Sequence, residues 1–237
     1  MGPAVVRAQA GPPFLTNDPG TPGHLQWEIN IGAMPTIARG LSDYQLPQID
    51  LNFGLGDRIQ LTYEIPYELQ TSTGQPRQSG WSNAYAGVKW RFLDRGEGGW
   101  QASIFPQVET GASAAMLRSG IASYGPRVLL PVEVTKRIGP LDVDTEIGYF
   151  PPRHGQSEQI MGLVIGRELT SRLELDVEAY DDRESGTPRR NTTLDAGGRY
   201  RFDDNLIALF MAGRGLNGAA NGQIEYVGYF GIQILIH

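Results

Sequence analysis

The chain repeats one pattern along almost its whole length, a strict alternation of apolar and polar residues. Near the start, for example, Trp27, Ile29 and Ile31 alternate with Glu28 and Asn30. A strand would place these apolar side chains on one face, whereas a helix would spread them around its circumference. Twelve segments of this kind predict strands, at 24–35, 45–54, 58–68, 82–92, 100–110, 126–136, 140–150, 158–168, 172–181, 191–202, 205–214 and 223–236.

Two of these segments, 158–168 and 205–214, are apolar on both faces, and glycines such as Gly162, Gly166 and Gly213 reduce the bulk on one of them. We still expect both to be strands, because they have the length and spacing of their neighbours.

The connections between the predicted strands alternate between longer and shorter. The shorter ones are tight turns such as Gly56-Asp57 and Asp203-Asp204, and the longer ones lie at 36–43, 69–80, 111–125, 151–157, 182–190 and 215–222. Outer-membrane barrels combine an even number of strands with short turns at one end and longer loops at the other. A soluble lipocalin-like barrel or a sandwich is the alternative, but it has no reason to sort its loops in this way. The sequence therefore predicts an all-β fold, a twelve-stranded antiparallel transmembrane barrel of the bacterial outer membrane.

Composition is consistent with this fold and excludes several others. The chain has 237 residues, no cysteine and a formal net charge of -6, which excludes disulfides and argues against a nucleic-acid partner. No apolar stretch approaches the roughly 18 residues of a membrane helix.

The chain divides into three parts. Residues 1–10 contain Ala8-Gln9-Ala10 and resemble the remnant of a signal peptide. Residues 11–23 are rich in proline and cannot form the interior of a strand; they could lie in the periplasm as an irregular segment or fold into the lumen as a plug. Residues 24–237 form the predicted barrel.

The polar face of the strands carries many charges, which we expect to line the lumen. A structural network of ion pairs is one interpretation, with Glu174 placed opposite Arg199. The other is a cation-preferring wall, since rings of carboxylates select cations in pores. The candidate lumen residues are Glu28, Asp50, Glu64, Lys89, Arg91, Asp142, Asp144, Glu146, Glu174, Asp176, Glu178, Asp195, Arg199 and Glu225.

Aromatic residues gather at the ends of the predicted strands. Membrane barrels place such residues in two girdles at the lipid–water interfaces. The predicted interface aromatics are Trp27, Trp81, Trp90, Trp100, Tyr149, Tyr200 and Phe202.

The sequence offers little for catalysis. Its three histidines are His24, His154 and His237, and none stands beside a serine in a recognisable nucleophile motif. No metal-ligand spacing and no phosphate-binding glycine motif occur. We therefore predict no enzymatic activity, no metal site and no cofactor.

Three motifs resemble the outer-membrane family named for the MetA pathway of phenol degradation. They are Pro12-Pro13-Phe14-Leu15-Thr16-Asn17-Asp18-Pro19, Leu46-Pro47-Gln48-Ile49-Asp50-Leu51-Asn52-Phe53-Gly54 and Gly87-Val88-Lys89-Trp90-Arg91-Phe92. The resemblance is strongest in the first 92 residues. It implies an outer-membrane barrel that passes aromatic or other hydrophobic compounds. One departure is His237, since such barrels commonly end on an aromatic residue.

The expected function is passive transport of small, hydrophobic or aromatic solutes, with outer-membrane lipids as the surrounding partner. The alternative is a barrel that conducts nothing and has a structural or partner-binding role. The sequence leaves the oligomeric state open.

Overall fold

The computed structural model describes residues 11–96, 98–110, 114–119, 122, 126–153, 156–187, 189–217 and 223–237. The predicted signal-peptide remnant at 1–10 lies outside these residues. Within them, no helix is long and apolar enough to span a membrane.

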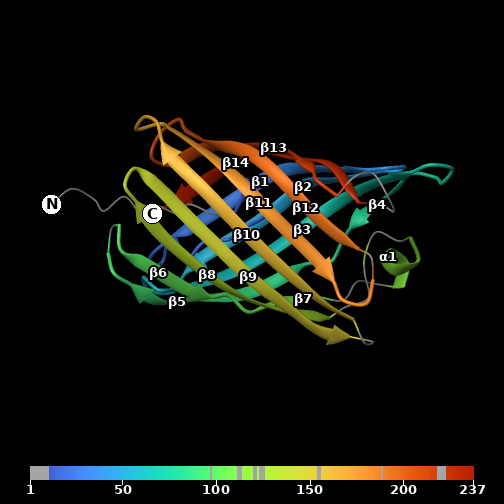
Figure 1. Cartoon of the computed structure of the whole chain (residues 1–237), viewed down its shortest axis with the longest axis horizontal. Helices are drawn as coiled ribbons and strands as arrows, with labels where there is room; N and C mark the ends of the chain where they lie inside the picture. The colour runs from blue at the N-terminus through green and yellow to red at the C-terminus, as the bar shows by residue number, and fades with distance from the viewer. Residues whose placement is uncertain are drawn as a thin grey trace.

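Strands dominate the described chain, and each of the twelve predicted segments overlaps at least one of them, whereas β4 lies outside the predicted segments (Figure 1). In order, the elements are β1 Trp27–Ala38, β2 Leu41–Gly54, β3 Ile59–Ser72, β4 Gln78–Trp81, β5 Tyr85–Asp94, β6 Trp100–Ile104, β7 Gln107–Glu109, α1 Ala114–Ser119, β8 Arg127–Ile138, β9 Leu141–Arg153, β10 Gln156–Glu168, β11 Leu173–Glu184, β12 Arg190–Arg201, β13 Leu206–Gly215 and β14 Ile224–Ile236.

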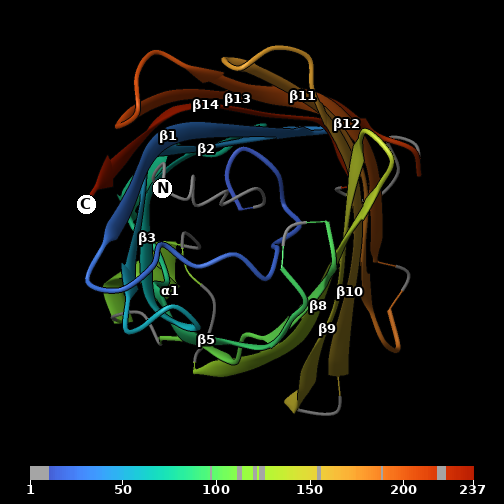
Figure 2. The same cartoon turned by 90° about the vertical axis from the view of Figure 1, so that its left-hand side faces the viewer.

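The sheet closes on itself because its last strand pairs with its first. β14 runs antiparallel to β1, with Trp27 opposite Ile236 and Gly32 opposite Gly231. Figure 2 shows the resulting ring. Closure pairs the first strand with the last, so neither is left as an open edge of the sheet, and a lipid environment requires such pairing.

Two of the wall strands are interrupted, which explains why fourteen strands form a twelve-stranded barrel. β4 and β5 both pair with β3, and β6 and β7 both pair with β8. The second interruption lies at Phe105-Pro106, where proline cannot donate a ladder hydrogen bond and the Phe105 amide instead donates to the Pro131 carbonyl at 3.2 Å. Counted as wall strands, the described elements confirm the predicted closed, twelve-stranded antiparallel barrel.

Three of the predicted long loops are largely strand. In 69–80, β3 continues to Ser72 and β4 begins at Gln78, which leaves a loop of residues 73–77. Residues 36–43 instead continue the β1–β2 hairpin down to the turn at Arg39-Gly40, where Gly40 has a φ of 76°. Glycine adopts this backbone conformation without strain, so the ladder can extend to the tip. Most of 151–157 also belongs to β9 and β10, although 154 and 155 lie outside the described residues. The two longest connections, between β7 and β8 and between β13 and β14, lie at one end of the barrel, which we call the loop end. The opposite end, where the chain ends at His237, is the turn end.

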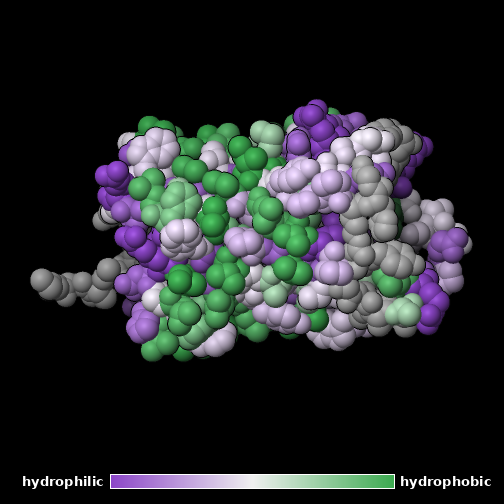
Figure 3. All heavy atoms as spheres, turned by 90° about the horizontal axis from the view of Figure 1, so that it is seen from below, coloured by the Kyte–Doolittle hydropathy of each residue, from purple (hydrophilic) through white to green (hydrophobic). Residues whose placement is uncertain are grey.

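Apolar residues face outward and polar residues face inward, the reverse of a soluble barrel. On β8, Leu130 and Val132 are 48% and 46% exposed. The next residue of the same strand, Glu133, is fully buried, and β8 pairs there with β6 on one side and β9 on the other. Figure 3 shows one face of the barrel, with hydrophobic residues across its body and hydrophilic residues gathered toward its two ends. This distribution is that of a membrane-spanning barrel, and it excludes the soluble alternative, which needs an apolar interior.

Candidate functional site

The barrel interior is the candidate site, and the structure places the predicted lumen residues along its wall. Glu64, Arg91, Glu174 and Glu225 are partly buried. The buried members of the set are Glu28, Asp50, Lys89, Asp142, Asp144, Glu146, Asp176, Glu178, Asp195 and Arg199.

Opposite charges meet at several points on this wall. Lys89 Nζ lies 3.3 Å from Glu133 Oε2, and Ser103 Oγ donates to the same carboxylate oxygen at 2.5 Å. Glu174 stands directly opposite Arg199 in the β11–β12 register, as predicted, with Arg199 Nη1 4.0 Å from Glu174 Oε1. These pairs offset part of the cost of placing charges inside the barrel.

A second cluster joins β1, β2 and β3 through amide side chains rather than cations. Asn30 Nδ2 donates to Asp50 Oδ2 at 2.9 Å and to Glu28 Oε1 at 3.1 Å. Asn52 Nδ2 donates to the same Asp50 oxygen at 2.8 Å, and Gln48 Nε2 donates to Glu64 Oε1 at 2.7 Å. Three predicted carboxylates are therefore held by neutral donors.

At the turn end, Arg91 Nη2 donates to the Asp57 carbonyl at 2.5 Å, and Arg91 Nε lies 3.4 Å from Asp94 Oδ2. Arg91 therefore joins two turns at the mouth of the barrel and stands apart from the acidic residues of β9–β12.

The N-terminal segment, residues 11–23, lies inside the barrel. Figure 2 shows it as a blue coil within the ring of strands. Thr16 and Thr21 are 0% and 1% exposed, and Asp18 is 4% exposed. The sequence leaves two locations open for this segment, the periplasm and the lumen, and in the structure the segment lies in the lumen.

Two carboxylates accept hydrogen bonds from the main chain of this segment. The Thr16 amide donates to Glu178 Oε1 at 2.7 Å, and the Leu15 amide donates to Glu178 Oε2 at 3.2 Å. The Asn17 amide donates to Glu146 Oε2 at 2.7 Å. Glu146 and Glu178 together accept three main-chain hydrogen bonds from the segment, so they are its main polar anchors.

Two cations bind the carbonyls of the same segment. Lys89 Nζ donates to the Asp18 carbonyl, and Arg199 Nη2 donates to the Pro12 carbonyl at 3.3 Å. The prolines in the segment have no amide that needs a partner. The acids of the wall thus match the amide donors of the segment and the bases match its carbonyl acceptors, which reduces the cost of burying its main chain.

Phe14 attaches the segment to an apolar patch on the inner wall. It is 5% exposed and belongs to a cluster formed by Val164, Ile207, Leu209, Met211, Val227 and Tyr229. This patch explains why the segments 158–168 and 205–214 are apolar on both faces: one face contacts lipid and the other contacts Phe14.

Gly162 leaves the space that Thr16 occupies. A Cβ on Gly162 would lie 2.0 Å from Thr16 Oγ1 and 2.8 Å from Thr16 Cβ. Charge alone could not reveal these contacts from the sequence. The signal that could have shown them is the combination of an inward glycine with inward apolar residues on β10.

All seven predicted interface aromatics have a third or more of their surface exposed: Trp27, Trp81, Trp90, Trp100, Tyr149, Tyr200 and Phe202. Each occupies an outward position of its strand or the end of one. Their placement at the lipid interface stays a prediction.

The described histidines lie at the turn end. His24 Nδ1 accepts from the Gly56 amide at 3.2 Å, and His237 Nδ1 lies 3.1 Å from Gln26 Oε1. His154 lies outside the described residues. The described chain contains no cluster of three or more possible metal ligands.

Known structures share this architecture at low sequence identity. No family model matches the chain, and no curated protein matches it. Among solved structures, an outer-membrane channel from Pseudomonas putida F1 has a TM-score of 0.67 at 12% identity, over 89% of this chain and 94% of that one. The NanC porin has a TM-score of 0.62 at 7% identity, over 87% and 98%. The KdgM porin has a TM-score of 0.59 at 10% identity, over 88% and 99%.

These similarities concern the fold. Together with the apolar outer wall and the polar interior, they show that the chain has the fold of an outer-membrane β-barrel.

Proposed function

We propose that the barrel is a narrow passive channel for small solutes, with the N-terminal segment occupying its lumen. The observation that carries this proposal is the docking of residues 11–23 on a charged inner wall. The wall side chains that hold the segment are polar, and water could hydrate them if the segment left. A twelve-stranded barrel is wider than the small barrels that side chains fill and narrower than open porins. No catalytic role forms part of the proposal.

For the solute, we propose hydrophobic or aromatic molecules, as the family resemblance implies. Planar-bilayer recording of the full chain tests both parts. We expect small current steps, and we expect an aromatic solute such as benzyl alcohol to reduce them more than glycerol does at the same concentration. Equal reduction by both solutes would contradict the aromatic preference. Silence of the full chain and of a chain without the segment would contradict the channel.

A non-conducting barrel with a structural or partner-binding role is the second candidate. The ion pairs of the inner wall favour it, because pairs such as Lys89 with Glu133 occupy lumen volume. The same recording separates the two functions.

The acidic wall formed by β9–β12 predicts selectivity for cations. Asp144 and Asp176 are 2% and 5% exposed on this wall. In a chain lacking residues 11–22, we expect D144N together with D176N to move the reversal potential toward zero in a potassium chloride gradient, because carboxylates in a pore attract cations. D204N, in an exposed turn, is the control. An unchanged reversal potential in the double variant would reject this selectivity.

A further inference from the structure

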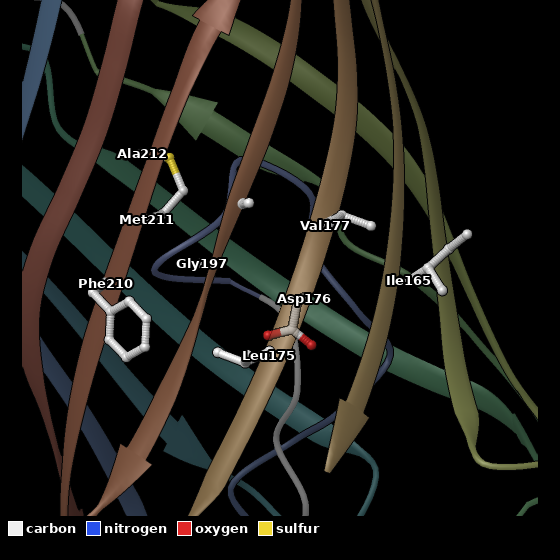
Figure 4. A pocket seen from close by; sticks show the side chains of 9 residues that line it. Ile165, Leu175, Asp176, Val177, Gly197, Phe210, Met211 and Ala212 are labelled. Atoms are coloured by element: carbon white, nitrogen blue, oxygen red, sulfur yellow. The ribbon is translucent and has the colours of Figure 1, made fainter. Parts of the chain in front are cut away.

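The outer wall over β10–β13 contains a groove with a volume of about 480 Å³. Its lining is apolar except for one carboxylate and consists of Ile165, Leu175, Asp176, Val177, Ala196, Gly197, Phe210, Met211 and Ala212 (Figure 4). The volume lies within the roughly 300–1,000 Å³ typical of sites for small ligands. Ile165, Leu175, Val177 and Phe210 occupy outward positions of their strands, so they form the sides of the groove toward lipid, whereas Asp176 and Met211 occupy inward positions beneath it.

The groove exists because two neighbouring strands carry only small residues at one level. Ala196 on β12 lies directly opposite Ala212 on β13 and directly opposite Val177 on β11. Gly198, the next outward residue of β12, adds no side chain. The base of the groove is therefore low across two strands, with larger side chains on both sides.

An arginine stands at the end of this groove that faces the loop end. Arg214 follows Ala212 by two residues on the same face of β13 and lies opposite Leu194 and Tyr226. It is exposed, and no side-chain hydrogen bond or ion pair connects it to the rest of the described chain. Its guanidinium is thus available next to an apolar surface.

Two more arginines extend the positive surface toward the loop end. Arg183 and Arg190 are directly opposed in the β11–β12 register, an arrangement that destabilises a sheet when both residues carry the same charge. Asp181 neutralises one of them, since Arg190 Nε lies 2.7 Å from Asp181 Oδ1. The three residues retain one net positive charge on the outer surface.

We propose that this surface binds a phosphorylated lipid of the outer leaflet, with an acyl chain in the groove and a phosphate on Arg214. The groove takes apolar chains, and the adjacent guanidinium pairs with phosphate through charge-assisted hydrogen bonds. A lipid with both parts matches the surface better than a free anion, which would gain nothing from the groove. Arg190 and Arg183 contact the more distant part of the headgroup.

The test uses the purified full chain in detergent, titrated with diphosphoryl lipid A and followed by native mass spectrometry. We expect one lipid to bind, and we expect R214Q to weaken this binding about tenfold, the loss expected for one charge-assisted contact. Filling the groove with A196L or A212L is also expected to reduce binding. Heat-modified migration on gels confirms that each variant is folded.

Matched controls separate the site from general lipid contact. R77Q removes an exposed arginine from the loop between β3 and β4, and A86L adds the same side chain to an outward alanine of β5; both are expected to bind like the unmodified chain. Equal weakening by R77Q, or unchanged binding in R214Q, would overturn the proposal. So would equal binding of dephosphorylated lipid A, or displacement of the lipid by inorganic phosphate at equal concentration.

Discussion

A chain lacking residues 11–22 is expected to conduct severalfold more current per channel than the full chain. The segment is buried in the lumen, where Thr16 and Thr21 are almost completely covered, so its removal replaces packed protein with water. Glu146 and Glu178 would lose their main-chain donors and become hydrated instead. Planar-bilayer recording of single channels measures the effect.

The control for this deletion is a chain in which residues 11–22 are replaced by glycine and serine at the same length. Such a segment keeps the tether but loses Phe14 and the prolines, so it should leave the lumen open for much of the time. Equal conductance of the deleted and full chains would show that the segment does not limit the current.

Replacement of Phe14 by alanine is expected to weaken docking of the segment while the barrel stays folded. Phe14 packs against a buried apolar cluster that includes Val164, Leu209 and Tyr229. Loss of a buried aromatic side chain costs about 3 kcal/mol or more, which corresponds to about a hundredfold more undocked chain. We expect frequent transitions to the conductance level of the deleted chain, measured as the fraction of time spent open.

F92A is the matched control, because Phe92 is 43% exposed on the outer surface of β5. It removes the same side chain from the lipid-facing side and should leave the open fraction unchanged. If F14A and F92A behave alike, the apolar patch on the inner wall does not hold the segment.

The barrel could be predicted from the sequence because its physical signal is local and repeated. Period-two alternation over ten residues needs no knowledge of distant contacts, and closure follows from the absence of water around the wall. The ends of the strands could be predicted less well from the sequence. At 36–43 the polar residues look like a loop, but in the structure they extend a hairpin whose tip depends on a single glycine, Gly40.

The inner wall could be predicted only in part. The inward position of Glu174 and its pairing with Arg199 followed from strand parity and hairpin register. The role of Glu146 and Glu178 did not, because their partners lie more than 120 residues away along the chain. The sequence shows that β10 and β13 are apolar on both faces, but it does not show that their inner faces pack against Phe14.

The N-terminal segment precedes β1 in the chain, yet its polar anchors stand on β5, β9, β11 and β12. It therefore behaves as a ligand tethered to its own receptor, and a short tether gives a local concentration on the order of millimolar. A segment held in this way stays bound even if its intrinsic affinity is weak. Small changes in that affinity therefore change how often the lumen is free, without any rearrangement of the barrel wall.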